Sequence, residues 1–246
     1  MPWLEFLKQT SWVDLTPGFK VPTQEILKEI RSVDQYFTRE REQAVAGIGS
    51  YIEGQTNWSA FTLYCASGSS RDLLTQGILG NQNRTAYAGS FRNLRRHQWT
   101  EVAALMPSTV NWIKLALEPF LILSHVKIAR LEPGGSIPEH SDLPEESFDL
   151  SGTNTYTMLN TLLIELDPPV GLRAYHDSVP LKYTIGSVFW CNQGRPHSTS
   201  NQGSQDRFNL RIHGLYRKKF KDFIKANIHG FEHHPQTKLL GGTLES

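Results

Sequence analysis

The residues best suited to chemistry in this chain of 246 residues lie in the segment PGGSIPEHSD, residues 133–142. His140 and Asp142 are two residues apart, so in a β-strand both side chains leave the same face, with Cα atoms about 6.6 Å apart. An imidazole and a carboxylate at that separation can bind one metal ion from one side. Two histidines and one carboxylate, with coordination positions left open, are typical of non-haem Fe(II) oxygenases.

A second histidine and a cation follow in the segment RPHSTSNQGSQDRFNLRIHGLY. Its pattern predicts a β-hairpin whose loop runs from Asn201 to Gln205. This pairing sets His197 opposite Asn209 and makes Arg207 a diagonal neighbour of His197 on the same face, at about 7–8 Å between Cα atoms. A guanidinium there can bind a carboxylate bidentately while the other end of the same ligand reaches the metal.

The strand after this loop alternates strictly between two kinds of side chain. The apolar residues are Phe208, Leu210 and Ile212, and the polar residues are Arg207, Asn209, Arg211 and His213. Such alternation predicts that one face packs on a core while the other faces a polar space. A polar, basic barrel interior is what a site for a charged small molecule requires. Arg211 shares the polar face and is the second candidate for the carboxylate anchor.

Two segments of the chain resemble the aspartyl/asparaginyl β-hydroxylase family. RLEPGGSIPEHSD is similar to the family pattern R-L-x-P-G-x-x-I-x-x-H-x-D, and GSVFWCNQGRPHSTSNQGSQDRF is similar to its second block, in which an Arg follows the distal His by ten residues. Members are Fe(II)- and 2-oxoglutarate-dependent dioxygenases on a double-stranded β-helix. The resemblance spans about residues 121–216.

The resemblance implies the roles of the candidate residues. Arg207 would bind the distal carboxylate of 2-oxoglutarate, and O₂ would take the last coordination position. Some members carry Arg-x-His on the next strand, with the His touching 2-oxoglutarate; here residues 158–160 read Met-Leu-Asn, so that role falls to Asn160. Asp142 fills a position that iron halogenases leave open, which favours hydroxylation. The implied ligands of Fe(II), and thus the catalytic centre, are His140, Asp142 and His197.

The implied reaction hydroxylates an amino-acid side chain, free or in a peptide, and releases succinate and CO₂. Arg173, Tyr175 and Trp190 are candidates for contact with this substrate. Two other functions stay open on the sequence. One is a cupin-type metalloenzyme that needs no keto-acid, and the other is a non-catalytic barrel that binds a small ligand or a protein.

The composition limits the compartment and the partners. A formal net charge of +1 argues against a broad nucleic-acid surface. No apolar run approaches the roughly 20 residues that cross a bilayer, and the N-terminus lacks the basic region of a secretion signal. Cys65 and Cys191 match no metal or redox spacing, so we expect buried thiols in a cytoplasmic protein without membrane or nucleic-acid partners.

The expected fold is mainly β with flanking helices. Short strands separated by turn signals after residue 121 predict a sandwich or barrel, and the resemblance implies a double-stranded β-helix, a cupin-like jelly roll. We expect a single domain over residues 1–246, with a mostly helical part at 1–120 packed on a barrel core at 121–216 and a C-terminal helix and tail at 217–246. A helix capped by Thr23 and a second helix at 108–120 belong to the first part. Trp112, Leu115 and Ala116 of the second helix are expected to pack inward. The acidic connection 143–154 is expected to be a surface loop, with a lid role left open.

Overall fold

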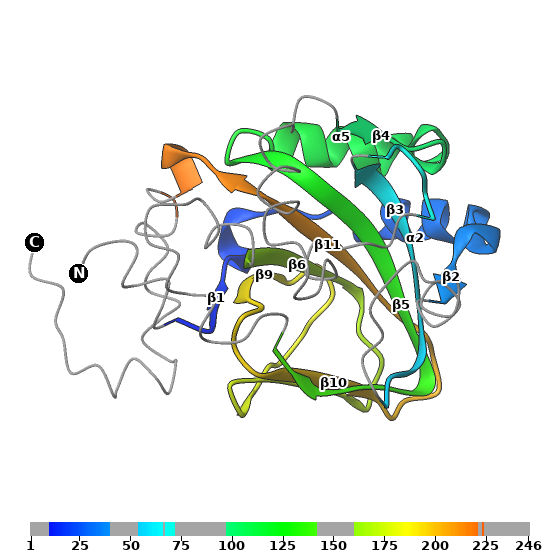
Figure 1. The fold of residues 1–246 in the computed structure, drawn as a ribbon, viewed down its shortest axis with the longest axis vertical. Helices are drawn as coiled ribbons and strands as arrows, with labels where there is room; N and C mark the ends of the chain where they lie inside the picture. Colours follow the sequence, from blue (N-terminus) through cyan, green and yellow to red (C-terminus); the bar gives the residue numbers. More distant parts are fainter. Residues whose placement is uncertain are drawn as a thin grey trace, which may run out of the picture.

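The structure is a computed structural model that describes residues 10–39, 54–65, 67–71, 97–141, 160–220 and 223. These residues form one antiparallel β-sheet with helices on one side (Figure 1). The helices are α2 (Thr23–Ser32) and α5 (Pro107–Ala116), with 3-10 turns η1 (Thr16–Gly18), η2 (Asp34–Tyr36) and η5 (Val102–Leu105). The strands are β1 (Trp12–Asp14), β2 (Thr38–Arg39), β3 (Thr56–Cys65), β4 (Gln98–Trp99), β5 (Leu121–His140), β6 (Asn160–Asp167), β7 (Leu172–His176), β8 (Val179–Pro180), β9 (Val188–Asn192), β10 (His197–Asn201) and β11 (Arg207–Tyr216).

The sheet curls into two facing walls. Its strand order is β1-β9-β6-β11-β5-β10-β7-β8, and β3 pairs with the other edge of β5. We call the strands β1, β9, β6, β11 and β3, with the first part of β5, the first wall. The second wall consists of the last part of β5 with β10, β7 and β8. These two facing walls of one antiparallel sheet, with helices beside them, confirm the predicted fold, which is mainly β and barrel-like.

Strand β5 belongs to both walls. The sequence predicts separate strands at 121–131 and 136–140, but the structure joins them into one strand that turns the corner of the barrel (Figure 1). Leu131 pairs with Arg207 of β11, and Ser136 pairs with Ser200 of β10. Between them Gly134 has φ +70°, and a Cβ built there would meet no atom within 4 Å. The left-handed backbone, and not lack of space, therefore favours glycine at this bend.

The predicted hairpin between β10 and β11 is wrong. β10 lies between β5 and β7, whereas β11 lies between β5 and β6. The connection from Asn201 to Arg207 crosses from the second wall to the first, so His197 and Asn209 are not cross-strand partners. Alternation along a strand reports which residues share a face, but it does not report which strand lies alongside.

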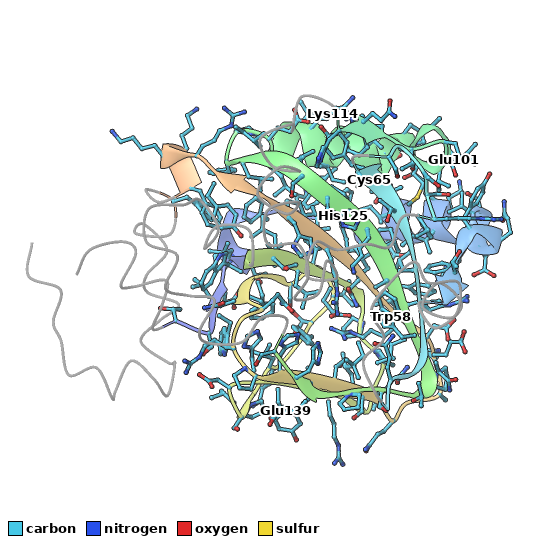
Figure 2. All side chains as sticks on the ribbon, viewed as in Figure 1. Trp58, Cys65, Glu101, Lys114, His125 and Glu139 are labelled. Carbon is cyan, nitrogen blue, oxygen red and sulfur yellow. The ribbon has the colours of Figure 1, made fainter. Side chains whose placement is uncertain are left out.

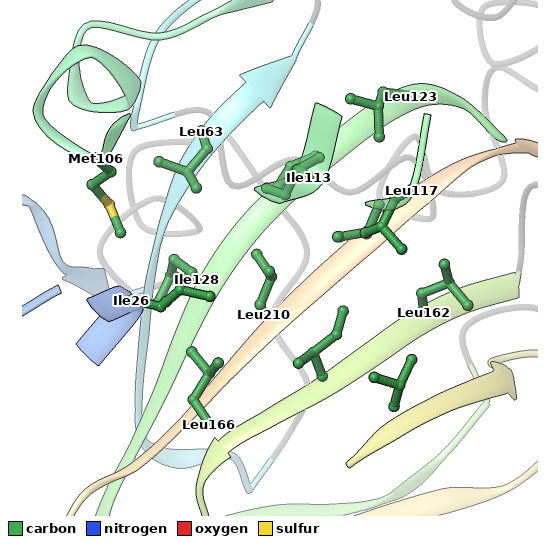
Figure 3. Close-up of a cluster of buried hydrophobic side chains, with 14 of the residues drawn as sticks. Ile26, Leu63, Met106, Ile113, Leu117, Leu123, Ile128, Leu162, Leu166 and Leu210 are labelled. Atoms are coloured by element: carbon green, nitrogen blue, oxygen red, sulfur yellow. The ribbon is translucent and has the colours of Figure 1, made fainter. Parts of the chain in front are cut away.

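The first wall buries its apolar face under the helices. Alternate residues of its strands form the main core, shown in part in Figure 3, together with Ile26 of α2 and Ile113 of α5. The helix predicted at Thr23 is α2, although Thr23 is its first helical residue and Pro22 holds the cap position. Trp112 and Ala116 of α5 pack against this core, as predicted, but Leu115 is 71% exposed, so its predicted inward packing is wrong. Ile113, two residues earlier, faces the core instead.

Only some of the predictions about domain organisation fall on residues that the structure describes. β1 and β3, which precede residue 121, pair within the same sheet as the barrel strands; the proposed division into parts stays a prediction. Most of 217–246 and all of 143–154 lie outside the described residues. Cys65 and Cys191 are buried free thiols, as expected. In the segments that the structure describes, no helix is long and apolar enough to span a membrane.

We expect Gly134→Ala to lower the free energy of unfolding by about 1–2 kcal/mol, because alanine resists the left-handed backbone that turns β5. Gly134→Asn should lose less, since asparagine tolerates that conformation. Chemical denaturation of both variants measures the difference. Equal stability of the alanine variant and the wild-type protein would contradict this account of the bend.

Candidate active site

Two histidines meet where β5 ends and β10 begins. His140 and His197 are register partners, and their ring centroids are 4.2 Å apart. Both side chains are half-buried, so a ligand from solvent can reach them. Glu139, which precedes His140, lies beside β10 in Figure 2. The structure thus brings together two of the three predicted metal ligands, from segments more than fifty residues apart in the chain.

A β-bulge aims His140 into the barrel. Thr199 pairs with Ile137 and His197 pairs with His140, so three residue steps on β5 oppose two on β10. In a regular strand Ile137 and His140 would point to opposite faces, because side chains alternate. The extra residue removes this conflict, so that Ile137 is buried in the interior cluster while His140 meets His197. Bulges occur often beside active sites, where they redirect one side chain.

The hydrogen bonds of both rings leave the same nitrogen suited to a metal. His140 Nδ1 lies 2.8 Å from the carbonyl oxygen of Pro138, and His197 Nδ1 lies 2.9 Å from that of Arg195. A carbonyl only accepts, so each Nδ1 carries the proton, and Nε2 of the neutral ring holds the lone pair. Metal-binding histidines generally donate their second nitrogen in this way. The two rings therefore fit a divalent metal.

Two other residues predicted for the metal site lie partly or wholly outside the described part of the chain. Asp142 is not among the described residues. For Asn160 the structure describes the backbone in β6 but not the side chain. Within the described segments no group of three His, Cys, Asp or Glu side chains could hold a metal ion. The carboxylate ligand and the role of Asn160 therefore stay predictions.

Arg207 reaches across the barrel and binds a carboxylate of the protein itself. Its Nε and Nη2 atoms donate to Glu165 of β6, with the shortest contact 2.7 Å, and its Nη1 donates to Thr199 of β10 at 3.0 Å. Arg207 is 2% exposed and Glu165 is fully buried. The Tyr183 ring lies 5.1 Å from the guanidinium carbon. The predicted anchor is thus fixed in one orientation, with one side of its planar fork occupied.

Glu165 is not among the residues that the sequence predicts for the site. Its signal is a single acidic residue within the apolar run LLIEL of β6, because a buried glutamate requires a partner. Burial raises the pKa of Glu165, and the Arg207 guanidinium opposes this effect. Burial also raises the pKa of the nearby Cys191 thiol to about 12, which keeps it protonated at neutral pH.

The contact with Thr199 places Arg207 near the histidine pair. His197 and Thr199 are two residues apart on β10, which is regular along β7, so both side chains leave the same face. The closeness of His197 and Arg207 that the sequence predicted as a hairpin contact arises instead across the interior. Arg211, the second candidate, is half-buried further along the same face and donates to Asn209 at 3.2 Å.

The interior face of β11 is polar, as the alternation predicts, whereas the interior faces of the neighbouring strands carry both polar and apolar side chains. Thr62 and Thr161 lie at hydrogen-bond distance from His125 and His213, and the Lys127 ammonium lies 5.2 Å from the Trp58 ring centre. The candidate substrate contacts lie elsewhere. Trp190 is buried in the main core, while Arg173 and Tyr175 are exposed on the outside of β7.

Comparison with known proteins gives one family and several solved structures of low sequence identity. The family model described as aspartyl/asparaginyl beta-hydroxylase matches residues 22–215. No curated protein gives a significant match. Among solved structures, a prolyl hydroxylase from Trichoplax adhaerens, in complex with a peptide fragment of a hypoxia inducible factor, is 13% identical with a TM-score of 0.46, and covers 89% of each chain. A prolyl-4-hydroxylase from Pseudomonas putida is 14% identical with a TM-score of 0.38, and covers 87% of this chain and 97% of its own.

We expect the buried ion pair to dominate local stability. Arg207→Met and Glu165→Leu, each alone, should lower the free energy of unfolding by about 3–5 kcal/mol, because the remaining charge is buried without its partner. The double variant should lose less than the sum of the two. Denaturation of all three variants gives the coupling energy. Asp34→Asn, which breaks the exposed pair with Arg130, serves as control and should lose less than about 1 kcal/mol. Strict additivity of the two losses would contradict a coupled pair.

Proposed function

Because the chain belongs to the aspartyl/asparaginyl β-hydroxylase family, we propose that it uses Fe(II) and 2-oxoglutarate to hydroxylate an amino-acid side chain, releasing succinate and CO₂. The family makes the chain a 2-oxoglutarate-dependent hydroxylase. The proposal adds the metal, the products and the class of substrate, which is a free amino acid or a residue of a peptide. The observation that carries it is the pair of histidines with both Nδ1 atoms bound to carbonyls.

In this proposal His140, His197 and Asp142 hold Fe(II). Each imidazole is held with a proton on Nδ1 by a carbonyl two residues earlier in the chain, which leaves Nε2 as the nitrogen that binds a metal. When bound, Fe(II) with 2-oxoglutarate and O₂ supplies the oxidising chemistry. The protein contributes orientation and a dry interior, since Trp58, Leu131 and Ile137 pack together beside the site.

Arg207 is our first assignment for the distal carboxylate of 2-oxoglutarate. Glu165 takes the edge formed by Nε and Nη2, so we assign the end formed by Nη1 and Nη2 to the ligand. Thr199 accepts from Nη1 at this end and lies on the strand of His197, which supports a ligand running from the metal to Arg207. Asn160 is proposed near the keto-acid end, and Arg211 is the second candidate for the anchor.

The ion pair with Glu165 gives Arg207 a fixed geometry before any co-substrate arrives. A guanidinium held on one edge loses less conformational freedom when its other end binds a carboxylate. The same pair weakens the purely electrostatic attraction for a ligand, because a second carboxylate approaches a guanidinium whose charge Glu165 already partly neutralises. The affinity for 2-oxoglutarate therefore depends on hydrogen-bond geometry at Arg207 as well as on charge.

Anaerobic titration with Fe(II) and 2-oxoglutarate tests the metal site. The wild-type protein should develop a visible metal-to-ligand charge-transfer band. His140→Ala and His197→Ala should lose the band and weaken Fe(II) binding by about 100-fold. Removing a ligand should cost at least as much affinity as removing an outer-shell partner, which costs about 10–100-fold. Lys28→Ala, an exposed change on α2, should behave as wild type. A screen of amino acids and peptides for stimulated succinate release then identifies the substrate.

A wild-type protein that binds Fe(II) and yields no band with 2-oxoglutarate would contradict the keto-acid chemistry and favour the cupin-type alternative. Absence of Fe(II) binding would favour a non-catalytic barrel. An undiminished band in either alanine variant would remove that histidine from the metal site.

The anchor is tested by two matched arginine variants. Arg207→Lys keeps the charge opposite Glu165 but loses the planar fork, so we expect KM for 2-oxoglutarate to rise about 10–100-fold, the equivalent of one charge-assisted hydrogen bond. Arg211→Lys should change KM less than about threefold. Steady-state kinetics at saturating Fe(II) provide the measurement. The reverse ranking would transfer the anchor to Arg211.

A further inference from the structure

The orientation of His197 depends on the carbonyl of Arg195. His197 Nδ1 donates to this oxygen at 2.9 Å, within the turn that joins β9 to β10. A bond to a residue only two positions earlier orients the ring with respect to that turn. A movement of the Arg195 carbonyl would therefore shift the preferred orientation of the imidazole. The position of His197 Nε2 thus depends on the position of this turn.

The side chain of Arg195 secures the turn to a neighbouring one. Its Nε and Nη2 donate to Asp177 Oδ2 at 3.0 and 2.5 Å. The backbone N–H of Asp177 donates to the carbonyl oxygen of Pro196 at 2.7 Å. Asp177 therefore contacts both residues that precede His197, one through its side chain and one through its backbone. The two side chains are 29% and 17% exposed, so the pair is partly shielded from water.

Asp177 is itself held in an unusual conformation. Asp177 and Ser178 have φ values of 54° and 63°, and they form the two-residue turn between β7 and β8. A turn with both central residues left-handed connects two-residue hairpins, and aspartate is among the residues that tolerate it. The hydroxyl of Ser11, which directly precedes β1, donates to Asp177 Oδ2 at 2.8 Å and so also holds this side chain.

The strand before this turn also faces His197. His176 is the register partner of His197, and the two rings stack at 5.3 Å with planes 16° apart. Asp177 is the next residue, so one short segment supplies a stacking ring for His197 and, through Arg195, supports its hydrogen-bond acceptor.

We propose that Asp177 and Arg195 are positioning residues for His197, acting through the Arg195 carbonyl without touching metal or substrate. This inference rests on the proposed role of His197 as a metal ligand. Removing the ion pair should loosen the turn and misdirect Nε2, in the way that outer-shell changes weaken metal sites in general. The effect should appear in metal affinity and in the ligand geometry, whereas contacts at Arg207 should be unaffected.

The test compares Arg195→Met and Asp177→Asn with Arg130→Met, which breaks an ion pair with Asp34 on the helix side of β5. Co(II) titration should show about tenfold weaker binding in the first two variants, with a changed ligand-field absorption spectrum. Arg195→Lys should recover part of the affinity. Arg130→Met should bind Co(II) as wild type does. Circular dichroism and thermal unfolding verify that each variant folds, and Asp177→Asn carries the test if Arg195→Met does not.

Two further results separate this inference from the proposed function. If His197→Ala binds Co(II) as tightly as wild type, the metal assignment of His197 is wrong and the inference fails with it. If His197→Ala loses the metal while Arg195→Met and Asp177→Asn keep wild-type affinity and spectrum, the metal site stands and the positioning role is overturned. A loss in Arg130→Met equal to that in Arg195→Met would also overturn it, because general destabilisation would then explain both.

Discussion

A single strand that serves both walls of the barrel is the constraint on which the site depends. β5 pairs with β11 and β3 up to Leu131 and with β10 from Ser136 onward. The bend at Gly134 and the bulge before His140 together decide where the strand ends and which way its last side chain points. Both devices are backbone features, so the site is defined by main-chain conformation before any side chain makes a contact.

The interior of the barrel is charged and buried, which is costly unless each charge is paired. Glu165 and Arg207 neutralise each other's charge as a buried ion pair, and Thr199 and Tyr183 also contact the guanidinium. The pair also links β6, β11 and β10, since its members and Thr199 come from these three strands. In the proposed function, stability and co-substrate recognition share this one guanidinium, so a change at Arg207 alters both.

Around the histidine pair, short local hydrogen bonds do most of the positioning. His140 and His197 each bond to a carbonyl two residues earlier, so the orientation of each ring depends on its own backbone segment. Contacts between residues distant in the chain hold these two segments, through strand pairing for β5 and through the Asp177–Arg195 pair for β10. A rigid site is therefore assembled from two local devices and a few non-local contacts.

Residue types and spacing were enough to identify the family, the histidines and the two faces of β11. The mechanism is local: alternation along one strand and fixed intervals between polar residues do not depend on what lies alongside. For β10, by contrast, the sequence predicts pairing with β11, whereas β10 pairs with β5 and β7, because the sequence does not reveal whether a short loop folds back or crosses between walls. Leu115 was placed inward for a similar reason, since the helix face that packs is chosen by the sheet it meets.

The sequence by itself determined which groups are available for chemistry, because their types and order are fixed by the chain. Only the tertiary structure decided how they are used. It brought Glu165 to Arg207, inserted a bulge that turned His140 inward, and placed Arg195 against Asp177. Each of these outcomes joins segments distant in the chain or alters backbone register, and free energies of burial and pairing over the whole barrel select them.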